Sequence, residues 1–328
     1  MSKGIKTKIN MTKKEKTTEE ETPKFIESEL YKGKVKVKFY PLSHQYWISL
    51  NGAPAKRKSG STTFIGIKDK STPLGMWQQQ MTADFLLKLI EAGTPINEDL
   101  AIEAIMQNDI AKDNAVDIGK EMHEWLEKYI KFKLKAKGFT SIPEIPNIPE
   151  AITGVNGFLT WEKEHKPKYI SSERMVYSMK HDFMDTLDLE AVVDGITCLC
   201  DFKSSNGLYN SVRMQTASYC EADEEERKEK VYGGRWALRF SKYTEAEYMK
   251  RETRKRFIKE KILLIKEKLG VVKVKEHKEY PIPAYQAFEA KFLDKEKGMK
   301  EYDMDAFLSA KNLYQWDQKT DWFYNPEY

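Results

Sequence analysis

An Asp-Gly pair between two β-prone apolar runs is the feature that most constrains how this chain folds. Asp194 and Gly195 stand between a run that ends at Val193 and a run that begins at Ile196. The pair favours a type I′ turn, because both turn residues of that type need positive φ. A two-residue loop also fixes the strand register. The sequence therefore predicts a hairpin over residues 187–203 in which Val193 faces Ile196.

The predicted register brings acidic side chains together. Asp188 would lie directly opposite Asp201, and Lys203 would share their face because side chains alternate along a strand. Like charges at facing positions destabilise a sheet by roughly 0.2–1 kcal/mol. A divalent cation held by one or two carboxylates removes that repulsion. The pattern indicates a metal site, and a solvated face with a chance Asp-x-Lys is the alternative.

The bulk composition sets the class of protein. The chain has 328 residues, of which 40% are hydrophobic and 32% charged, and these values are typical of a globular protein of one large domain or two. The net charge of +4 is too small to indicate nucleic-acid binding by itself. Between residues 250 and 275, however, eleven Lys or Arg stand against three Glu. This basic segment predicts either nucleic-acid contact or a solvated basic face.

The three cysteines and the apolar runs exclude several classes. No Cys-x-x-Cys pair occurs, so the spacing of zinc fingers is absent and a reducing compartment fits. No apolar run approaches the ~18 residues of a membrane span, and the first residues have no apolar core of a secretion signal. We expect neither membrane insertion nor secretion.

The pattern along the chain predicts four regions. They are a disordered tail over 1–24, a hairpin and helical subdomain over 25–110, a core over 111–245 and a basic helical extension over 246–328. The first subdomain is expected to contain strands within 35–49 and helices at 74–91 and 98–110. The core is expected to contain helices at 111–133, 151–164 and 208–222, strands at 169–179 and 235–240, and the hairpin. Beyond it we expect a helix to about 269, a short strand at 271–275 and helices at 284–297 and 303–313.

Several polar residues stand out on these elements. His123 lies at the edge of an apolar stripe on the helix 111–133, where a structural role and a functional one are both open. Glu173 falls within the strand 169–179. Gln215 and Tyr219 are four apart and would share one face of their helix.

Six short motifs follow one another along the chain. They are Ser61-Thr62-Thr63-Phe64 with Leu74-x-x-Trp77, Gly119 to His123, Glu173 to Ser178, Thr186-Leu187-Asp188, Asp201 to Ser205, and Gln215-x-x-x-Tyr219. With them the chain resembles the PD-(D/E)xK nucleases of the RecB-type exonuclease branch. It looks most like their phage-encoded and mitochondrial genome maintenance exonuclease members, over roughly residues 40–245. The resemblance implies an α+β, restriction-endonuclease-like core with a central mixed sheet flanked by helices.

The resemblance also implies a metal and a catalytic group. The implied ligands of Mg²⁺ or Mn²⁺ are His123, Asp188, Asp201 and the backbone carbonyl of Phe202. Lys203 would orient or help deprotonate the attacking water and stabilise the developing charge. The implied group further contains Gln215 and Tyr219, which would position the DNA strand or the lysine, and Glu173, for which a structural ion pair is the alternative.

The chain departs from the family pattern in a few places. Asp185 stands where a glycine is expected and could compete as a ligand, and Ser204 replaces a threonine. The cysteines that hold an iron–sulfur cluster in some relatives have no counterparts, so we expect no cluster.

The function implied is that of a metal-dependent DNA exonuclease acting on single strands or DNA ends. A role in phage-type recombination, repair or DNA processing would go with it, in the cytoplasm of a bacterial host and with a recombination or replication protein as a partner. Three alternatives stay open. They are a catalytically silent module that binds DNA ends, an endonuclease of the same fold, and a structural protein whose carboxylates form ordinary ion pairs.

Overall fold

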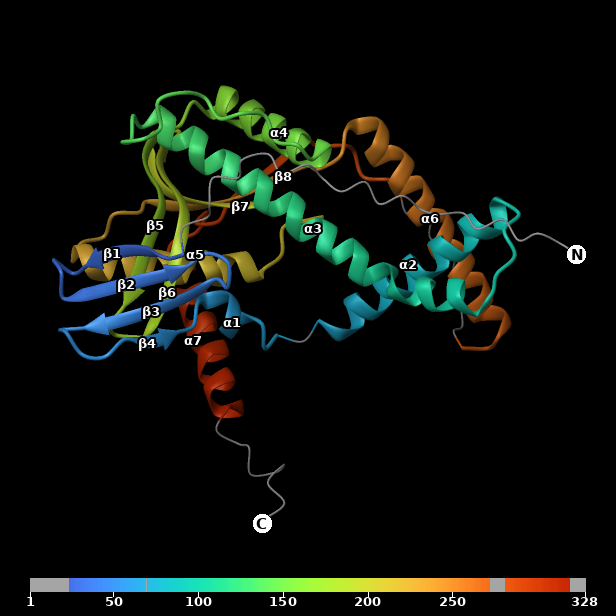
Figure 1. Cartoon of the computed structure of the whole chain (residues 1–328), viewed down its shortest axis with the longest axis horizontal. Helices are drawn as coiled ribbons and strands as arrows, with labels where there is room; N and C mark the ends of the chain where they lie inside the picture. The colour runs from blue at the N-terminus through green and yellow to red at the C-terminus, as the bar shows by residue number, and fades with distance from the viewer. Residues whose placement is uncertain (1–23, 69, 272–280, 319–328) are drawn as a thin grey trace, which may run out of the picture. The chain divides into compact units, whose positions relative to one another are not determined.

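The structure is a computed structural model that describes residues 24–68, 70–271 and 281–318 (Figure 1). Nearly all of the expected tail and most of the expected strand at 271–275 lie outside these residues. The chain divides into two compact units, Met1–Lys58 and Ser59–Tyr328. Among the described helices, none combines the length and the apolar character that crossing a bilayer requires.

The N-terminal unit contains a four-stranded antiparallel sheet in which each strand pairs with the next. Its strands are β1 (Ile26–Leu30), β2 (Val35–Tyr40), β3 (Gln45–Leu50) and β4 (Lys56–Lys58). On β2 the valines Val35 and Val37 are buried while Lys36 and Lys38 are exposed, which is the alternation expected of a strand with one covered face. The strands expected within 35–49 are confirmed.

The second unit is built on a five-stranded mixed sheet. Its strands, in spatial order, are β5 (Lys168–Ser178), β6 (Phe183–Val193), β7 (Ile196–Lys203), β8 (Gly234–Phe240) and β9 (Phe288–Phe292). Neighbours are antiparallel except for β7 and β8, which run parallel. A parallel pair needs a crossover connection, and the segment between the two strands contains helix α5 (Ser211–Arg227). The expected α+β fold with a central mixed sheet flanked by helices is confirmed.

Helices cover both faces of this sheet (Figure 1). The other helices are α1 (Ser61–Ile65), α2 (Ser71–Glu91), α3 (Glu98–Lys133), α4 (Pro149–His165), α6 (Glu245–Lys268) and α7 (Met299–Asp317). On one face, Met122 of α3 and Phe158 of α4 pack with Phe202 of β7. On the other face, Tyr219 of α5 and Phe307 of α7 join a second apolar cluster. Burial on both faces explains why consecutive residues of the hairpin strands, such as Leu199, Cys200 and Asp201, are all buried.

Two expected elements differ from the structure. The helices expected at 98–110 and 111–133 are one continuous helix, α3, so the expected boundary at 110 falls inside it. The helix expected at 284–297 is wrong, because residues 288–292 form strand β9, which pairs with β8. The sequence Phe-Glu-Ala-Lys-Phe alternates apolar and polar residues, and a distant strand supplies its pairing partner.

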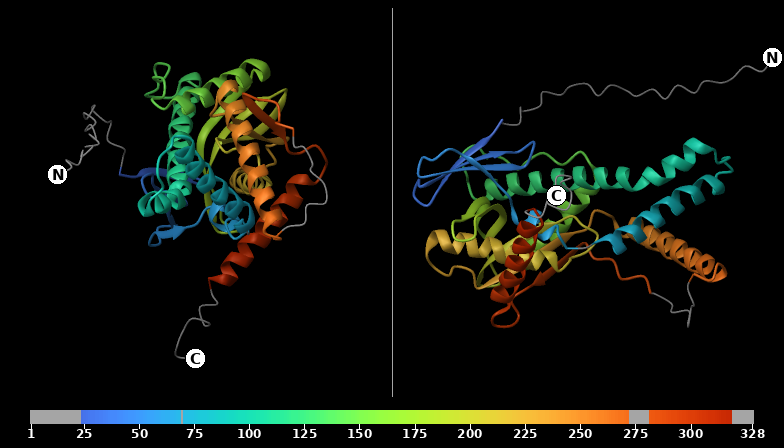
Figure 2. Two further views of the ribbon diagram at one scale, coloured as in Figure 1. Left: turned by 90° about the vertical axis from the view of Figure 1, so that its right-hand side faces the viewer. Right: turned by 90° about the horizontal axis from the view of Figure 1, so that it is seen from below.

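A group of three helices continues beyond the sheet (Figure 2). Helix α2 packs along α3 and also contacts α6. Arg254 of α6 joins two α2 carboxylates, with Nε 2.7 Å from Asp84 and Nη1 2.7 Å from Glu91. The basic helix therefore uses one of its cations to attach itself to the rest of the unit.

A buried arginine ties strand β8 to α7. Arg235 of β8 is completely buried, and its Nη2 lies 2.6 Å from Oδ1 of Asp294 and 2.8 Å from Oδ2 of Asp303. Its Nη1 donates to the carbonyl of Arg213 at 2.9 Å. Three segments distant in sequence thus meet at one guanidinium.

Replacing Arg235 with alanine is expected to destabilise the protein by about 3–5 kcal/mol, because the buried Asp303 would keep only Arg213 as a cation and the partly buried Asp294 would lose its guanidinium partner. Urea unfolding followed by circular dichroism measures the change. Arg256→Ala is the matched control, since its pair with Glu260 is exposed and should contribute less than about 1 kcal/mol. A loss at Arg235 no larger than the loss at Arg256 would contradict the role of this contact.

Candidate active site

The central hairpin has the turn and the register that the sequence predicts. Asp194 and Gly195 have φ values of 50° and 84°, as a type I′ turn requires. The ladder then runs outward without a shift as far as the pair Leu189 and Cys200. This part of the prediction is confirmed.

The ladder stops one pair short of the two acids. Asp188 and Asp201 therefore do not form the directly facing pair that the register predicts. Oδ2 of Asp188 instead accepts a hydrogen bond of 2.6 Å from the backbone N–H of Phe202. Asp201 pairs on its other side with Ala237 of β8. Like-charge repulsion disfavours two directly opposed carboxylates at this point of the sheet.

The neighbouring strand is irregular at the same level. Glu173 of β5 has φ of +52°, in the left-handed region that costs a non-glycine residue about 1–2 kcal/mol. Regular pairs form on either side of it, Ser172 with Leu189 and Arg174 with Leu187. Glu173 and Asp188, which would have paired between them, do not. Strained backbone of this kind is common at functional sites, and no local sequence signal foretells it here.

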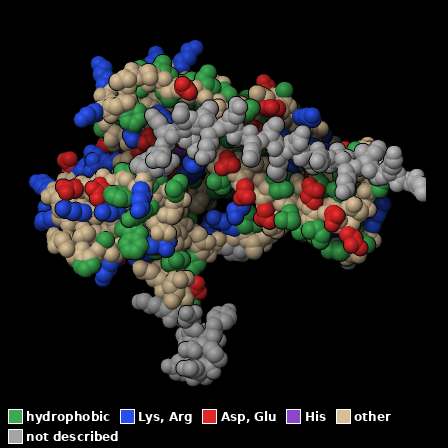
Figure 3. Space-filling model, viewed as in Figure 1, with side chains coloured by type: hydrophobic (Ala, Val, Ile, Leu, Met, Phe, Trp, Pro, Cys, Tyr) green, Lys and Arg blue, Asp and Glu red, His purple; other side chains and the backbone are tan. Residues whose placement is uncertain are grey.

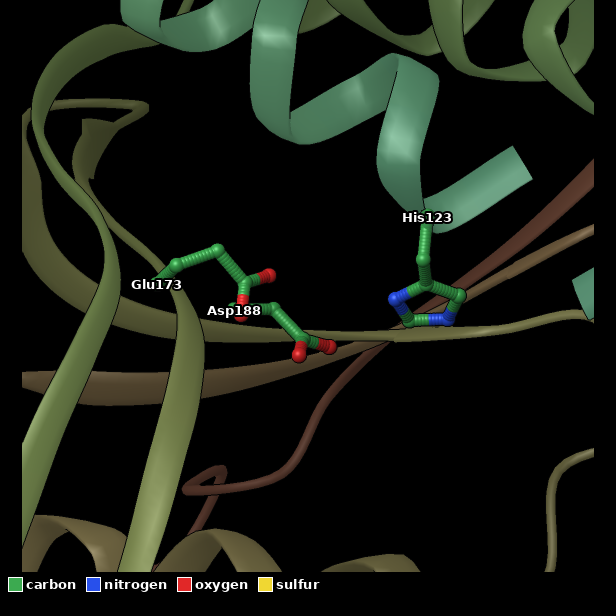
Figure 4. Close-up of side chains that lie close together, drawn as sticks. All are labelled: His123, Glu173 and Asp188. Carbon is green, nitrogen blue, oxygen red and sulfur yellow. The ribbon is translucent and has the colours of Figure 1, made fainter. Parts of the chain in front are cut away.

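Three potential metal ligands meet at this irregularity. His123 of α3, Glu173 and Asp188 each offer one atom, and these atoms all lie within 4.8 Å of one another (Figure 4). The two carboxylates come from the sheet and the imidazole reaches toward them from the helix above (Figure 4). Two of the ligands implied by the resemblance, His123 and Asp188, belong to this group together with Glu173, and Asp201 is not one of the three.

Asp201 forms an ion pair with the predicted lysine. Nζ of Lys203 lies 2.6 Å from Oδ2 of Asp201, and the aspartate is completely buried. Among the described residues, Oδ1 of Asp201 has no hydrogen-bond partner. A buried acceptor without a partner is unusual in a folded protein and is a position where a cation or an ordered water fits.

The carboxylates share one electrostatic environment. Burial raises the pKa of Glu173 well above its ordinary value, and the charges of Asp188 and Glu127 raise it further. Burial also raises the pKa of Asp188, although Lys203 and the Phe202 N–H oppose the shift. Burial is also the largest cause of the raised pKa of Asp201, which is about 6. Each of these groups would be easier to ionise beside a cation.

The two basic residues have opposite protonation states. Burial, followed by the charge of Lys203, lowers the pKa of His123 to about 4, so its imidazole is neutral at neutral pH. The centre of this ring lies 6.2 Å from the centre of the Phe202 ring, which places the imidazole beside β7. Burial alone would lower the pKa of Lys203, but Asp201 and Asp188 outweigh it and the pKa is raised. The site therefore holds a neutral imidazole and an ammonium ion.

The predicted glutamine and tyrosine of α5 also lie at this site. Nε2 of Gln215 donates a hydrogen bond of 2.6 Å to Oη of Tyr219. Burial raises the pKa of the Tyr219 phenol, and the charges of Asp185, Asp201 and Asp188 add to the shift. The phenol is thus close to the carboxylates and stays protonated at neutral pH.

Asp185, at the position where the resemblance predicts a glycine, has a structural partner. Both of its oxygens accept from the Ser61 N–H, at 3.1 and 3.0 Å, and Oδ1 also accepts from Oγ of Ser61 at 3.2 Å. A Cβ at Gly60 would lie 2.8 Å from Oδ1, so this close approach requires glycine. The carboxylate anchors the start of α1, and it is not among the three residues that converge as potential metal ligands.

A second glycine lies where α3 approaches β7. A Cβ added at Gly119 would lie 2.9 Å from Oγ of Ser204, the residue that follows Lys203. The glycine of the predicted Gly-x-x-x-His motif therefore lets the helix that presents His123 pass close to the end of the lysine strand.

No protein-family model matches this chain, and a search of curated proteins gives no match either. Function is therefore inferred from the chemistry of the site and from the motif resemblance alone.

The pH dependence of the free energy of unfolding should reveal the raised pKa of the buried Asp185. Burial raises the pKa of this group from its ordinary 3.8 to about 8, although the hydrogen bonds from Ser61 oppose the shift. Between about pH 4 and pH 8 the folded chain then holds a proton that the unfolded chain releases. The free energy of unfolding therefore falls as pH rises through that window.

Asp185→Asn should make this fall shallower, as measured by urea unfolding at intervals of pH. The comparison is between slopes, because Glu173, Asp188 and Asp201 contribute in the same direction and are unchanged in the variant. Equal slopes for the two proteins would show that Asp185 titrates normally.

Proposed function

We propose that this protein is a metal-dependent nuclease that hydrolyses phosphodiester bonds in DNA. The observation that carries the proposal is the convergence of His123, Glu173 and Asp188 within 4.8 Å, beside the ion pair of Asp201 and Lys203. The order of motifs that resembles the PD-(D/E)xK nucleases supports it. In its specific form the proposal is an exonuclease acting on single strands or DNA ends.

The residues present fit a hard divalent cation. Two carboxylates and a neutral imidazole suit Mn²⁺ as well as Mg²⁺, and His123, Glu173 and Asp188 would hold the ion. Asp201, with a buried oxygen that has no hydrogen-bond partner among the described residues, could complete the set. Bound there, such an ion polarises a phosphate and lowers the pKa of a water molecule. Its charge would also offset the mutual repulsion of the acids.

The lysine supplies positive charge, because its raised pKa keeps the ammonium protonated. Asp201 holds Nζ at 2.6 Å and so fixes the direction in which the charge is presented. A fixed charge of this kind stabilises the negative charge that develops on a phosphate during hydrolysis. As a protonated ammonium, Lys203 can orient the attacking water. It could take a proton from that water only after losing its own proton.

The group on α5 supplies hydrogen bonds. Tyr219 is buried beside the carboxylates and accepts a hydrogen bond from Gln215. In this arrangement the glutamine fixes the orientation of the phenol, and the phenol keeps its proton as a donor. The pair would position either Lys203 or a phosphate of the bound strand.

Labelled DNA incubated with Mg²⁺ or Mn²⁺ tests the hydrolysis. Wild type should release product, and Asp201→Asn, Glu173→Gln and Lys203→Ala should each reduce the rate by roughly 10²–10³, the loss typical of a group that stabilises transition-state charge. Lys137→Ala, at an exposed position after α3, is the charge-matched control and should cut normally.

Free-ended and circular substrates in the same assay separate the two forms of the activity. An exonuclease leaves circular single strands intact and shortens linear ones, whereas an endonuclease cuts both. No cleavage by wild type in either metal would refute the enzyme, and retention of DNA in chelator without cleavage would identify a binding module.

Metal binding should raise the thermal stability of wild type, because an ion that binds only the folded state stabilises it by about 2.7 kcal/mol at 100 times its Kd. Glu173→Gln should lose most of this rise. In chelator the same variant should be more stable than wild type, since one buried carboxylate with a raised pKa is gone.

Asp109→Asn, an exposed change on the helix that presents His123, is the matched control and should keep the full metal response. Thermal melts with MgCl₂, MnCl₂ or chelator measure all three proteins. A metal-induced rise of equal size in Glu173→Gln and wild type would place the ion elsewhere.

A further inference from the structure

The N-terminal sheet has one face that is not buried, called here the open face. The cross-strand register places Lys38, Trp47 and Arg57 next to one another in a single row across β2, β3 and β4. Lys36 and Tyr40 share this face, because they lie two residues from Lys38 on the same strand. The core residues of this sheet occupy the opposite face, and they are Leu30, Val35, Val37, Tyr46 and Ile48.

Exposed aromatic rings lie on the open face. Trp47 is 37% exposed and Phe25, which precedes β1, is 36% exposed. The rings of Phe25 and Tyr40 lie 5.9 Å apart, so Phe25 is on this side of the sheet. Large aromatic side chains in the middle of a water-facing sheet surface are not needed for its core, and they offer flat faces to a ligand.

Cations alternate with these rings. Nζ of Lys38 lies 4.6 Å from the centre of the Phe25 ring, and the same lysine is the cross-strand neighbour of Trp47. Arg57 is the neighbour of Trp47 on the other side. Figure 3 shows basic and hydrophobic side chains together over the region of β1–β3.

The acidic residues of the open face lie on its edge strand. Glu27 and Glu29 of β1 pair with Lys38 and Lys36 at 3.2 and 3.9 Å. These side chains are largely exposed, and ion pairs of this kind contribute little. An anionic ligand can therefore replace Glu27 and Glu29 as the partner of the two lysines at small cost.

We propose that the open face binds single-stranded nucleic acid. Bases would stack on Trp47 and on the pair of Phe25 and Tyr40, and phosphates would contact Lys36, Lys38 and Arg57. Unpaired bases have free faces that can stack on aromatic side chains, whereas the bases of a duplex are already stacked. The face lacks exposed aliphatic side chains among its paired positions and carries two glutamates, which disfavours a lipid surface. This binding does not depend on the proposed hydrolysis.

Fluorescence anisotropy with a labelled oligothymidylate, in chelator, tests the surface on the full-length protein. Trp47→Ala should weaken binding roughly 5- to 150-fold, the change expected for loss of one stacked base. Trp47→Phe should stay close to wild type because it keeps a flat ring. Trp316→Ala, which removes an exposed tryptophan of α7, is the matched control and should bind as wild type does.

Salt dependence tests the cations. Replacing both Lys38 and Arg57 with glutamine should reduce the slope of log K against log salt by about 1.4, since each phosphate contact on a single strand contributes about 0.7. The matched control replaces Lys255 and Lys259, two exposed cations of α6, with glutamine. Circular dichroism melts establish that all variants are folded.

Two results would overturn the proposal. One is wild-type affinity in both Trp47→Ala and the Lys38 and Arg57 double variant. The other is a larger loss in the Lys255 and Lys259 control than in the sheet variants, which would move the binding surface to α6. Strong binding in chelator without cleavage in metal would refute the proposed hydrolysis and leave this surface standing.

Discussion

The candidate site at one end of the sheet is organised by the burial of several carboxylates beside one lysine. Glu173, Asp188 and Asp201 all have raised pKa values with burial as the largest cause. Lys203 forms an ion pair with one of them. Such a concentration of acid in a protein interior is costly unless a further positive charge compensates it. The broken ladder, the left-handed Glu173 and the hydrogen bond from Phe202 to Asp188 are local responses to this constraint.

The surrounding elements hold this unfavourable arrangement in place. Ser61 at the start of α1 is bound to Asp185 on the strand that carries Asp188. Gly119 allows α3, and with it the imidazole, to come close to the end of β7. On the face of the sheet that α5 covers, Tyr219 lies close to the same carboxylates. Residues from most of the short motifs thus make contacts at or near one group of carboxylates, although the motifs are far apart in the chain.

The sequence predicted the regular parts of this site better than the irregular ones. The hairpin register follows from local rules of turn geometry, so Asp194 and Gly195 were enough to place Leu189 opposite Cys200. The failure of Asp188 and Asp201 to pair could not be predicted, because it depends on competition between cross-strand pairing, repulsion and a hydrogen bond to Phe202. Glu173 lies with His123 and Asp188 at a position where its φ is +52°, and local sequence rules do not predict such a backbone conformation for a glutamate. Strand β9 was missed since its partner is remote in sequence.

Diffraction from crystals soaked in Mn²⁺ tests the central claim most directly, because anomalous scattering locates the ion independently of any activity. The account predicts one strong peak within ligand distance of His123, Glu173 and Asp188. It also predicts that Asp201 stays in its pair with Lys203 or turns its free oxygen toward that peak. A fully occupied site elsewhere, with these three side chains unchanged and bound only to protein or water, would contradict it.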